Sequence, residues 1–288
     1  MQEQLIKLKT ENGGYLALWK INSKESQSNK NILLTHGTFS NRKVLNGIAQ
    51  YLVAHQFTCW IFEWRNHGDS SRQKENFDFE TIGEQDFKYV FNYLFVERHI
   101  EQIDCITHSG GGICLTIALV NQPQFQNRIN SISMFACQAF GAANSRLNYA
   151  KIYFTNWTSK IVGSIPAKKI GGEENESYYL MKQWFDWNLT REFKGKSGVN
   201  YKEKMKKISV PILSIYGAGD TFIAPPTGCQ QFLAAFENPH NKSLLCAKAN
   251  GYSENYNHSR ILHSKNASRE IYPTVLEWII QNENITRQ

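Results

Sequence analysis

Hydrophobic and polar positions along this chain follow two periods, which alternate from one segment to the next. Near the start, residues 4–9 and 15–21 alternate apolar and polar side chains around Asn12-Gly13-Gly14, which predicts a β-hairpin. Beyond it, short runs that are apolar throughout predict buried strands, and longer stretches with apolar residues every three or four positions predict helices. The later predicted strands are 31–35, 57–62, 103–106, 131–136, 209–215 and 243–247, and the predicted helices are 40–55, 80–97, 111–121, 227–236 and 268–281.

This order of elements predicts an α/β fold. Strands that alternate with helices favour a mostly parallel sheet with helices on both faces, here with eight strands once the hairpin is included. The alternation stops between Phe140 and Lys206, where the chain is helical in pattern and rich in aromatic residues. We therefore predict a core of residues 1–137 and 207–288, with a helical cap, residues 138–206, inserted after the sixth strand.

The aromatic residues of the predicted cap have two interpretations. They can form the cap's own hydrophobic core, or they can line an apolar pocket over the core domain. They are Tyr153, Phe154, Trp157, Tyr178, Tyr179, Trp184, Phe185 and Trp187.

Composition narrows the class of protein. The chain has 288 residues, of which 41% are hydrophobic and 20% charged, as suits one large α/β domain with an insertion. No apolar stretch approaches the ~20 residues of a membrane helix, and the N-terminus has no signal-peptide pattern, so a cytoplasmic location is expected. The six cysteines form no CxxC pair and several lie in apolar runs, which favours buried thiols over disulfides or a zinc site.

The net charge of +7 is scattered rather than striped, apart from a cluster at Lys202, Lys204, Lys206 and Lys207. A solvated face explains such a cluster, and a weak attraction to anionic lipid surfaces is the functional alternative. No nucleic-acid-binding motif accompanies the positive charge, so nucleic acid is not an expected partner.

The segment Thr107-His108-Ser109-Gly110-Gly111-Gly112 carries the clearest chemical signal. A serine between a strand and a helix, followed at once by glycines, is typical of a nucleophile elbow, where the helix N-terminus faces the site. The alternative for Ser109 is an ordinary helix N-cap. A serine nucleophile needs a base to take its proton and a third group to orient that base.

Suitable partners follow other predicted strands. In open α/β sheets, functional groups gather beyond the carboxyl ends of the strands. Asp220 follows strand 209–215 on a glycine-containing loop, and His258 follows strand 243–247 on a polar loop. The order Ser109, Asp220, His258 is the chain order of one familiar triad lineage.

Alternatives remain for two of these residues. Asp220 also fits a turn aspartate, although Asp104 in a strand and Asp186 in the predicted cap are poorer candidates for the acid. His263 is the rival of His258, which is nearer to the end of the last predicted strand.

Two further strand ends carry compatible loops. His36-Gly37-Thr38 follows strand 31–35, where a backbone N–H can point at an oxyanion, and a glycine-containing turn, residues 65–70, follows strand 57–62. His36 and His67 are expected to hydrogen-bond neighbouring loops beside the site.

As a set, these motifs resemble those of the α/β-hydrolases, near the monoglyceride lipase, lysophospholipase and serine-aminopeptidase-like branch. His36-Gly37-Thr38 resembles the family's oxyanion loop, residues 63–70 its D-x-R-G-H-G-x-S segment, residues 107–111 its nucleophile elbow and residues 217–220 its acid loop. The chain departs from the family pattern with Thr107 and Asn66 in place of glycine and Glu63 in place of aspartate.

The resemblance implies a serine hydrolase that cleaves a carboxylic ester, lipid-like or of medium acyl length, through an acyl-enzyme and with no metal or organic cofactor. Ser109, Asp220 and His258 would be the triad, and the backbone N–H groups of Thr38 and Gly110 the oxyanion hole. The residues expected to line the site are His36, Gly37, Phe39, His108 and Trp184. Amide hydrolysis as in aminopeptidases, acyl transfer, and ligand binding without turnover are the alternatives on the same fold.

Overall fold

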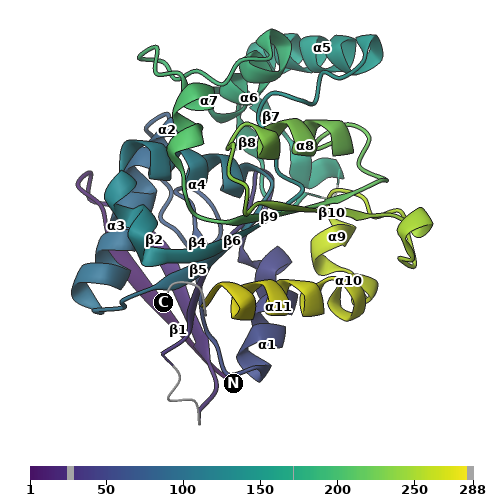
Figure 1. Cartoon of the computed structure of the whole chain (residues 1–288). Coiled ribbons are helices and arrows are strands. Elements are labelled where there is room, and N and C mark those ends of the chain that lie inside the picture. Colours follow the sequence, from purple (N-terminus) through teal and green to yellow (C-terminus); the bar gives the residue numbers. More distant parts are fainter. Residues whose placement is uncertain (25–28, 171, 284–288) are drawn as a thin grey trace.

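A sheet of eight strands forms the centre of the computed structural model, which describes residues 1–24, 29–170 and 172–283 (Figure 1). Its strand order is β1-β2-β4-β3-β5-β6-β9-β10. Neighbouring strands are parallel except at one edge, where β1 pairs antiparallel with β2 and β2 with β4. The strands are β1 (Gln2–Lys9), β2 (Tyr15–Asn22), β3 (Asn31–Thr35), β4 (Thr58–Glu63), β5 (Ile103–His108), β6 (Ile129–Phe135), β9 (Ile212–Gly217) and β10 (Lys242–Cys246).

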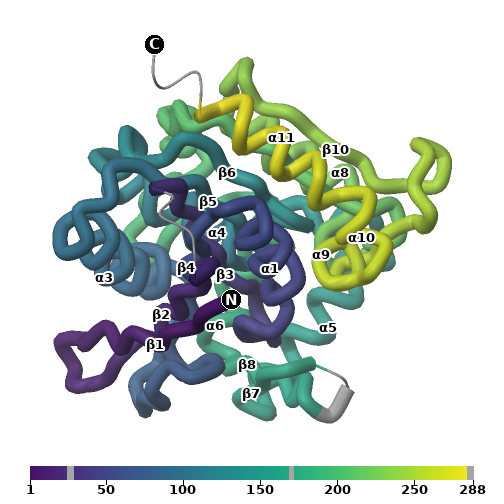
Figure 2. The backbone as a smooth tube through the Cα atoms, turned by 90° about the horizontal axis from the view of Figure 1, so that it is seen from below, coloured from purple at the N-terminus to yellow at the C-terminus, as the bar shows by residue number. Residues whose placement is uncertain are grey.

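Helices cover both faces of this sheet. Figure 2 shows α1 and α11 lying side by side over one face, with α9 and α10 beside them. The helices of the core are α1 (Asn46–Ala54), α2 (Phe79–Thr81), α3 (Phe87–Phe91), α4 (Gly110–Asn121), α8 (Pro226–Ala234), α9 (Arg260–His263), α10 (Lys265–Glu270) and α11 (Tyr272–Glu283). The π-helical segment η2 (Ile82–Asp86) joins α2 to α3, and a second, η3 (Asn92–Glu97), extends α3 into one helical stretch, as the spacing over 80–97 predicts. The 3₁₀ helices of the core are η1 (Arg42–Leu45), η4 (Pro123–Arg128), η6 (Met205–Lys207) and η7 (Lys248–Asn250).

The buried strands are apolar throughout because each has a hydrophobic core on both sides. In β3, Leu33 belongs to the core under α3 and α4, whereas Ile32 and Leu34 belong to the core under α1 and α11. The alternation of side chains along a strand sends successive residues into the two cores. The predicted mostly parallel sheet with helices on both faces is therefore confirmed.

Among the element boundaries that differ from the sequence prediction, proline accounts for two. Strand β9 begins at Ile212 rather than at residue 209, because Pro211 has no N–H to donate to a neighbouring strand. The predicted helix 268–281 is two helices, α10 and α11, and Pro273 stands in the first turn of α11, where its missing N–H costs nothing.

The chain between β6 and β9 forms a separate layer beyond the carboxyl ends of the parallel strands, at the top of Figure 1. Its two long helices, α5 and α6, pack against each other, and a small antiparallel pair, β7 with β8, adjoins them. The elements are α5 (Arg146–Val162), β7 (Ser164–Ile165), η5 (Ala167–Ile170), β8 (Glu176–Ser177), α6 (Tyr178–Thr190) and α7 (Tyr201–Lys204). A largely helical insertion after the sixth strand is thus confirmed, and the pair β7–β8 was not expected.

All six cysteines are buried and carry free thiols, in agreement with their interpretation from the sequence. Across the described ranges, no three His, Cys, Asp or Glu side chains form a group that could hold a metal ion. Within the same residues, none of the helices has the length and apolar character needed to cross a bilayer.

Candidate active site

Ser109 occupies a strained turn between β5 and α4. Its backbone has φ +52° and ψ −123°, a region that residues other than glycine rarely adopt and that costs of order 1–3 kcal/mol. The Ser109 N–H is held by the carbonyl oxygen of Phe135 at 2.8 Å. Within the described contacts, its hydroxyl forms no capping bond to the helix that it precedes, so the N-cap alternative does not explain this serine.

The glycines around Ser109 are required by close packing. A Cβ on Gly37 would lie 2.7 Å from the Cβ of Ser109, and one on Gly111 would lie 2.6 Å from the His36 carbonyl oxygen. Thr107 stands where the α/β-hydrolase motif has glycine, and it is buried. It packs against Gly112, whose missing side chain leaves room for it. The elbow conformation therefore forms despite the substitution.

Asp220 and His258 are bonded to each other beyond the ends of β9 and β10. The Oδ2 atom of Asp220 lies 2.6 Å from His258 Nδ1, and the carboxylate also accepts from the N–H groups of Ile223 and Ala224 at 3.0 and 3.1 Å. Burial alone would raise the pKa of Asp220, but the hydrogen bond and charge of His258, with the two N–H groups, hold it below its ordinary value. Because Nδ1 is engaged, Nε2 is the nitrogen of His258 that is left to act as a base.

His263, the rival histidine, does not share this arrangement. It is exposed at the end of α9, and among the described contacts Asp220 bonds only to His258 of the two. The geometry therefore favours His258 as the partner of the carboxylate.

No hydrogen bond joins the Ser109 hydroxyl to His258 among the described residues. The two side chains border adjoining cavities that share Thr38, Phe39, Ile165 and Ile223 as walls. Hydrogen bonds between a nucleophile and its base are often long or poorly aligned without substrate. The direct contact that a triad requires is thus not made in this conformation, although the two groups flank the same loop.

His108 links the elbow to the histidine loop. Its Nε2 lies 2.9 Å from the carbonyl oxygen of His258, and the two imidazole centroids are 4.9 Å apart. Burial and the charge of His258 lower the pKa of His108 to about 3. His108 is therefore neutral and donates its Nε2–H to that carbonyl. Sequence reasoning placed His108 among the lining residues, and it does border the cleft beside His258.

The loop after β3 offers backbone donors next to Ser109. Phe39 has a positive φ of 62°, and its N–H donates to Glu176 Oε1 at 2.8 Å. Among the described hydrogen bonds none uses the N–H of Thr38, and Gly110, as the first residue of α4, has an N–H with no partner within the helix. These two N–H groups are free to bind an oxyanion.

His36 and Gly37 lie behind this loop and border neither cavity. The His36 Nδ1 donates to the Gly37 carbonyl oxygen at 2.8 Å, and its Nε2 accepts from the Trp64 N–H at 3.3 Å. Burial and the nearby His67 lower the pKa of His36 well below its ordinary value, so the ring is neutral. Its two hydrogen bonds connect the loop after β3 to the backbone of Trp64.

Two cavities meet at the candidate site. The smaller, about 140 Å³, contains Ser109 and Gly110 and is walled mainly by apolar side chains of the core and the insertion, among them Phe79, Met181, Trp184, Phe185 and Phe222, with Thr155 beside them. The larger, about 690 Å³, is more polar and contains His108, His258 and His263 together with Lys43. Trp184 and Ser109 thus line the same small cavity.

Only some aromatic residues of the insertion form its core or line a pocket, the two roles predicted from the sequence. Trp184 and Phe185 line the small cavity, and Trp187 is buried in the core. Four others are more than half exposed, so the expectation of core or lining is wrong for them. These four are Tyr153, Phe154, Trp157 and Tyr179.

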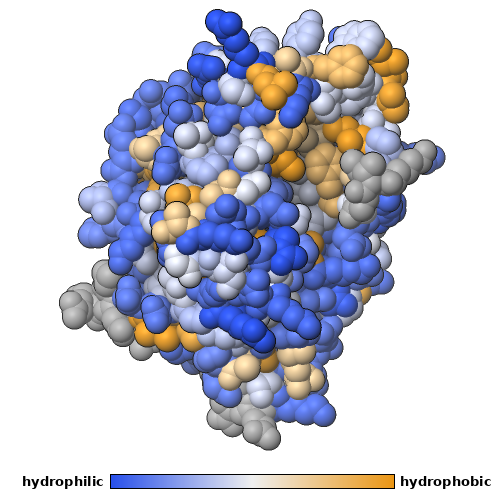
Figure 3. Space-filling view, turned by 90° about the vertical axis from the view of Figure 1, so that its right-hand side faces the viewer, coloured by the Kyte–Doolittle hydropathy of each residue, from blue (hydrophilic) through white to orange (hydrophobic). Residues whose placement is uncertain are grey.

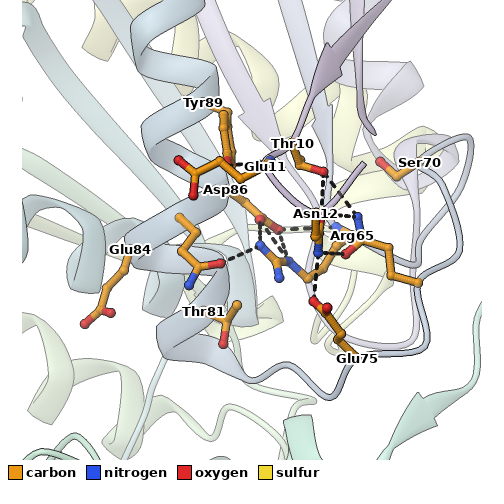
Figure 4. A network of polar contacts seen from close by, with 12 residues as sticks. Thr10, Glu11, Asn12, Arg65, Ser70, Glu75, Thr81, Glu84, Asp86 and Tyr89 are labelled. Carbon is orange, nitrogen blue, oxygen red and sulfur yellow. Dashed lines mark hydrogen bonds and ion pairs between the residues drawn. The ribbon is translucent and has the colours of Figure 1, made fainter. Parts of the chain in front are cut away.

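The charged segment after β4 is structural. Figure 4 shows Arg65 facing Asp86, with which it forms a buried ion pair. Arg65 also donates to Gln85 Oε1 at 3.1 Å, so this turn is tied to η2. Asn66, in place of the family's glycine, has φ +62°, a conformation that asparagine tolerates better than most residues. Asn66 therefore keeps the left-handed backbone conformation that glycine would allow at this position.

The site also contains residues that sequence reasoning missed. Glu176 reaches from β8 of the insertion to the Phe39 N–H and to His67, 2.8 Å from each. Phe79, Met181 and Phe222 wall the small cavity. No local motif marks any of them, because only the folded chain brings these distant segments to the elbow.

Comparisons with known proteins agree with this architecture. A family model described as the alpha/beta hydrolase fold matches residues 30–158. No curated protein matches the chain. Among solved structures, a monoacylglycerol lipase from Paleococcus ferrophilus is similar with 15% identity and a TM-score of 0.66, over 93% of this chain and 99% of that chain. A thermophilic esterase from Thermogutta terrifontis has 14% identity and a TM-score of 0.62, over 97% and 99%. An esterase from Pyrococcus furiosus has 16% identity and a TM-score of 0.63, over 97% and 90%.

Proposed function

We propose that this chain, which has the α/β-hydrolase fold, is a serine hydrolase that cleaves carboxylic esters through an acyl-enzyme. One observation carries the proposal: a serine in a positive-φ turn borders a cavity that adjoins the cleft of the bonded Asp220–His258 pair, next to two backbone N–H groups that make no described hydrogen bond. That combination supplies a nucleophile, a base with its orienting carboxylate, and donors for an oxyanion. The similarity to solved esterases and a lipase supports the choice of esters.

In the proposed mechanism, His258 Nε2 takes the hydroxyl proton as Ser109 Oγ attacks the ester carbonyl carbon. The oxyanion of the tetrahedral intermediate accepts hydrogen bonds from the N–H groups of Thr38 and Gly110. The carbon–oxygen bond to the alcohol then breaks, and His258 returns the proton to the departing alcohol. Water, deprotonated by the same nitrogen, attacks the acyl-enzyme and releases the acid.

The oxyanion donors and the Asp220 carboxylate account for much of the expected rate acceleration of ester cleavage. Each oxyanion donor in such a site contributes about 3–4 kcal/mol to the transition state. The lowered pKa of Asp220 keeps its carboxylate ionised at neutral pH, where it stabilises the imidazolium that forms on His258.

The two cavities suggest how an ester binds. We assign the acyl group to the small apolar cavity around Ser109, under the cap of residues 138–206, and the alcohol to the larger polar cleft beside His258. Because the apolar cavity is smaller than the ~300–1,000 Å³ of drug-sized pockets, it favours a short to medium acyl chain.

We further propose an anionic lipid surface as a partner, docked on the outer face of α5. This face exposes Leu147, Tyr153, Phe154, Trp157 and Ile161, each by more than half, and Figure 3 shows apolar side chains gathered at the end of the molecule where the insertion lies. Helix α5 carries three basic residues and no acidic one, so its charge complements anionic headgroups. A second copy docked on the same face would bring like charges together.

The lysine cluster at Lys202, Lys204, Lys206 and Lys207, for which lipid attraction is the functional alternative, is a weaker candidate. Lys206 already pairs with Glu203 and Glu237, at 3.7 and 3.0 Å, which offsets part of its charge. The exposed apolar side chains of α5 lie on a different helix from this cluster. Helix α5 combines both properties that an interfacial helix needs.

Flotation with vesicles tests the lipid proposal. Vesicles of phosphatidylcholine with phosphatidylglycerol should carry the protein upward, less so at high salt, and Trp157→Ser with Phe154→Ser should lose this binding. Val96→Ser, which changes an equally exposed apolar residue on η3, should bind as the parent does. Undiminished binding by the α5 variant, or a dimer in sedimentation that the same variant dissolves, would refute a lipid partner for this face.

A fluorophosphonate probe tests the proposed function. Only an activated serine reacts with it, so the folded protein should gain one adduct, which peptide mass spectrometry should locate on Ser109. His258→Ala should react far more slowly, while His263→Ala should react like the parent. No adduct on the folded protein would indicate a ligand-binding protein without turnover.

A further inference from the structure

Glu176 makes the only side-chain bridge, among the described contacts, between the insertion and the backbone of the oxyanion loop. One carboxylate oxygen, Oε1, accepts both from the Phe39 N–H and from His67 Nε2, each at 2.8 Å. The carbonyl side of Phe39 is held as well, because the backbone N–H groups of Glu173 and Glu174 donate to the Phe39 carbonyl oxygen at 3.0 and 3.1 Å. The peptide groups on both sides of Phe39 are thus held by residues 173–176.

The geometry around His67 calls for a protonated ring. Its Nδ1 faces the carbonyl oxygen of Arg65 at 2.9 Å and its Nε2 faces the Glu176 carboxylate, so both nitrogens point at acceptors. The two side chains are almost completely buried, with exposed fractions of 2% and 1%. Burial alone would lower the pKa of His67, but the charge and hydrogen bond of Glu176 raise it above its ordinary value.

Other charged and titratable groups surround the pair. His36 lies 5.1 Å from His67 between ring centroids and is neutral, as described above. Glu174 adds a second negative charge and is itself bound by Asn41, Arg72 and Lys168. Asp86 faces Arg65. The acidic side chains and the Arg65 carbonyl oxygen thus favour the protonated His67, while burial opposes it.

We propose that Glu176 is a positioning residue which, through its bond to protonated His67, fixes the Thr38–Phe39 peptide and, through it, the preceding Gly37–Thr38 peptide, so that the Thr38 N–H faces the oxyanion. This inference rests on the proposed ester hydrolysis. Phe39 has a positive φ, and a bulky residue keeps such a conformation only when its surroundings impose it. Glu176 and the backbone of residues 173 and 174 supply that constraint. The insertion therefore builds part of the oxyanion hole in addition to covering the acyl cavity.

The proposal predicts a particular dependence on pH. His67 has a raised pKa, so its charge and the bridge are complete below that value and are lost as pH rises through it. Once His67 has a single proton, that proton cannot serve both the Arg65 carbonyl and Glu176. The oxyanion loop then loosens, and kcat should fall on the alkaline side with little change in KM.

Two variants of Glu176 separate charge from hydrogen bonding. Glu176→Gln keeps an oxygen for the Phe39 N–H but removes the charge that raises the pKa of His67. Its kcat should equal that of the parent at low pH and should fall at a pH lower than in the parent by about 1–3 units. Glu176→Ala removes the acceptor, so its kcat should fall at every pH by about tenfold or more, short of the ~10²–10³ for a lost donor.

The control is Glu192→Gln, which removes a carboxylate of the same insertion that pairs with Lys194 at the surface, and its profile should match the parent. All rates are divided by the fraction of sites that react with fluorophosphonate, which corrects for unfolded protein. Overlapping kcat profiles for the parent and both Glu176 variants would overturn the positioning role while leaving the hydrolase intact. A loss that disappears after this correction would also overturn it. A parent without any fluorophosphonate reaction would instead reject the proposed function.

Discussion

His108, the residue before Ser109, donates from its Nε2 to the backbone carbonyl oxygen of His258 at 2.9 Å. This bond connects the end of β5 directly to the loop after β10, across two intervening strands of the sheet. It fixes the position of the proposed base by holding its main chain, while Asp220 orients its ring. His108 therefore helps to hold the backbone of His258 in place.

We expect His108→Phe to lower kcat by about tenfold to a hundredfold, because a displacement of His258 by a fraction of an ångström to 1 Å disturbs proton transfer. Phenylalanine fills a similar volume but leaves the His258 carbonyl unpaired. His55→Phe is the control, since His55 is an exposed histidine whose Nδ1 also bonds a backbone carbonyl, that of Tyr51. An unchanged kcat in His108→Phe would show that Asp220 alone positions the base.

The two candidate histidines should differ sharply when each is removed. His258→Ala takes away the ring bonded to Asp220 and should lower kcat by about 10³-fold or more. His263→Ala removes an exposed ring at the border of the cleft and should leave kcat within a few-fold. Steady-state kinetics with a p-nitrophenyl ester decide between them, and the reverse ranking would assign the base to His263.

The pH dependence of stability should report the Asp220–His258 bond. Asp220 has a folded-state pKa below its ordinary value of 3.8, so its stabilisation is complete above that value and is lost as pH falls through the lowered pKa. The parent should therefore exceed Asp220→Asn in unfolding free energy at neutral pH, and the difference should shrink at the acidic end. Urea unfolding at several pH values measures it. A difference that stays constant into strong acid would mean that the carboxylate is not held in this way.

Acyl-chain preference should follow the cavity around Ser109. Across p-nitrophenyl esters, kcat/KM should rise from acetate by up to about fourfold per CH₂, at ~0.8 kcal/mol each, and then level off when the cavity is full. Met181→Ala should move the plateau to longer chains, whereas Val96→Ala, remote from the cavity, should not. A flat series in the parent would show that the acyl group binds elsewhere.

Much of the fold could be predicted because strands that are apolar throughout have one physical cause, burial between two hydrophobic cores. Residues such as Ile32 and Leu33 are both apolar because they enter different cores, and this is the mark of a central parallel strand. The candidate site could be located from the same reasoning. Ser109, Asp220 and His258 each follow a predicted strand, and parallel strands end at one edge of the sheet.

What could not be predicted depends on contacts between distant parts of the chain. Glu176 reaches Phe39, 137 positions earlier, and no property of either residue alone indicates the contact. Phe154 and Trp157 have two interpretations from the sequence, the cap's core or the lining of a pocket, because large aromatic side chains usually bury much of their surface. Only the packing of α5 on α6 shows that these side chains face outward.

The most direct measurement of the central claim is ester turnover by Ser109→Ala. The substitution removes one oxygen atom from a strained turn, and the parent and the variant should unfold at closely similar urea concentrations. We predict that kcat for a p-nitrophenyl ester falls by about 10⁴-fold or more, and that adding His258→Ala lowers it little further, because the triad acts as a unit. A folded Ser109→Ala variant that keeps most of the parent's turnover would contradict the assignment of Ser109 as the nucleophile.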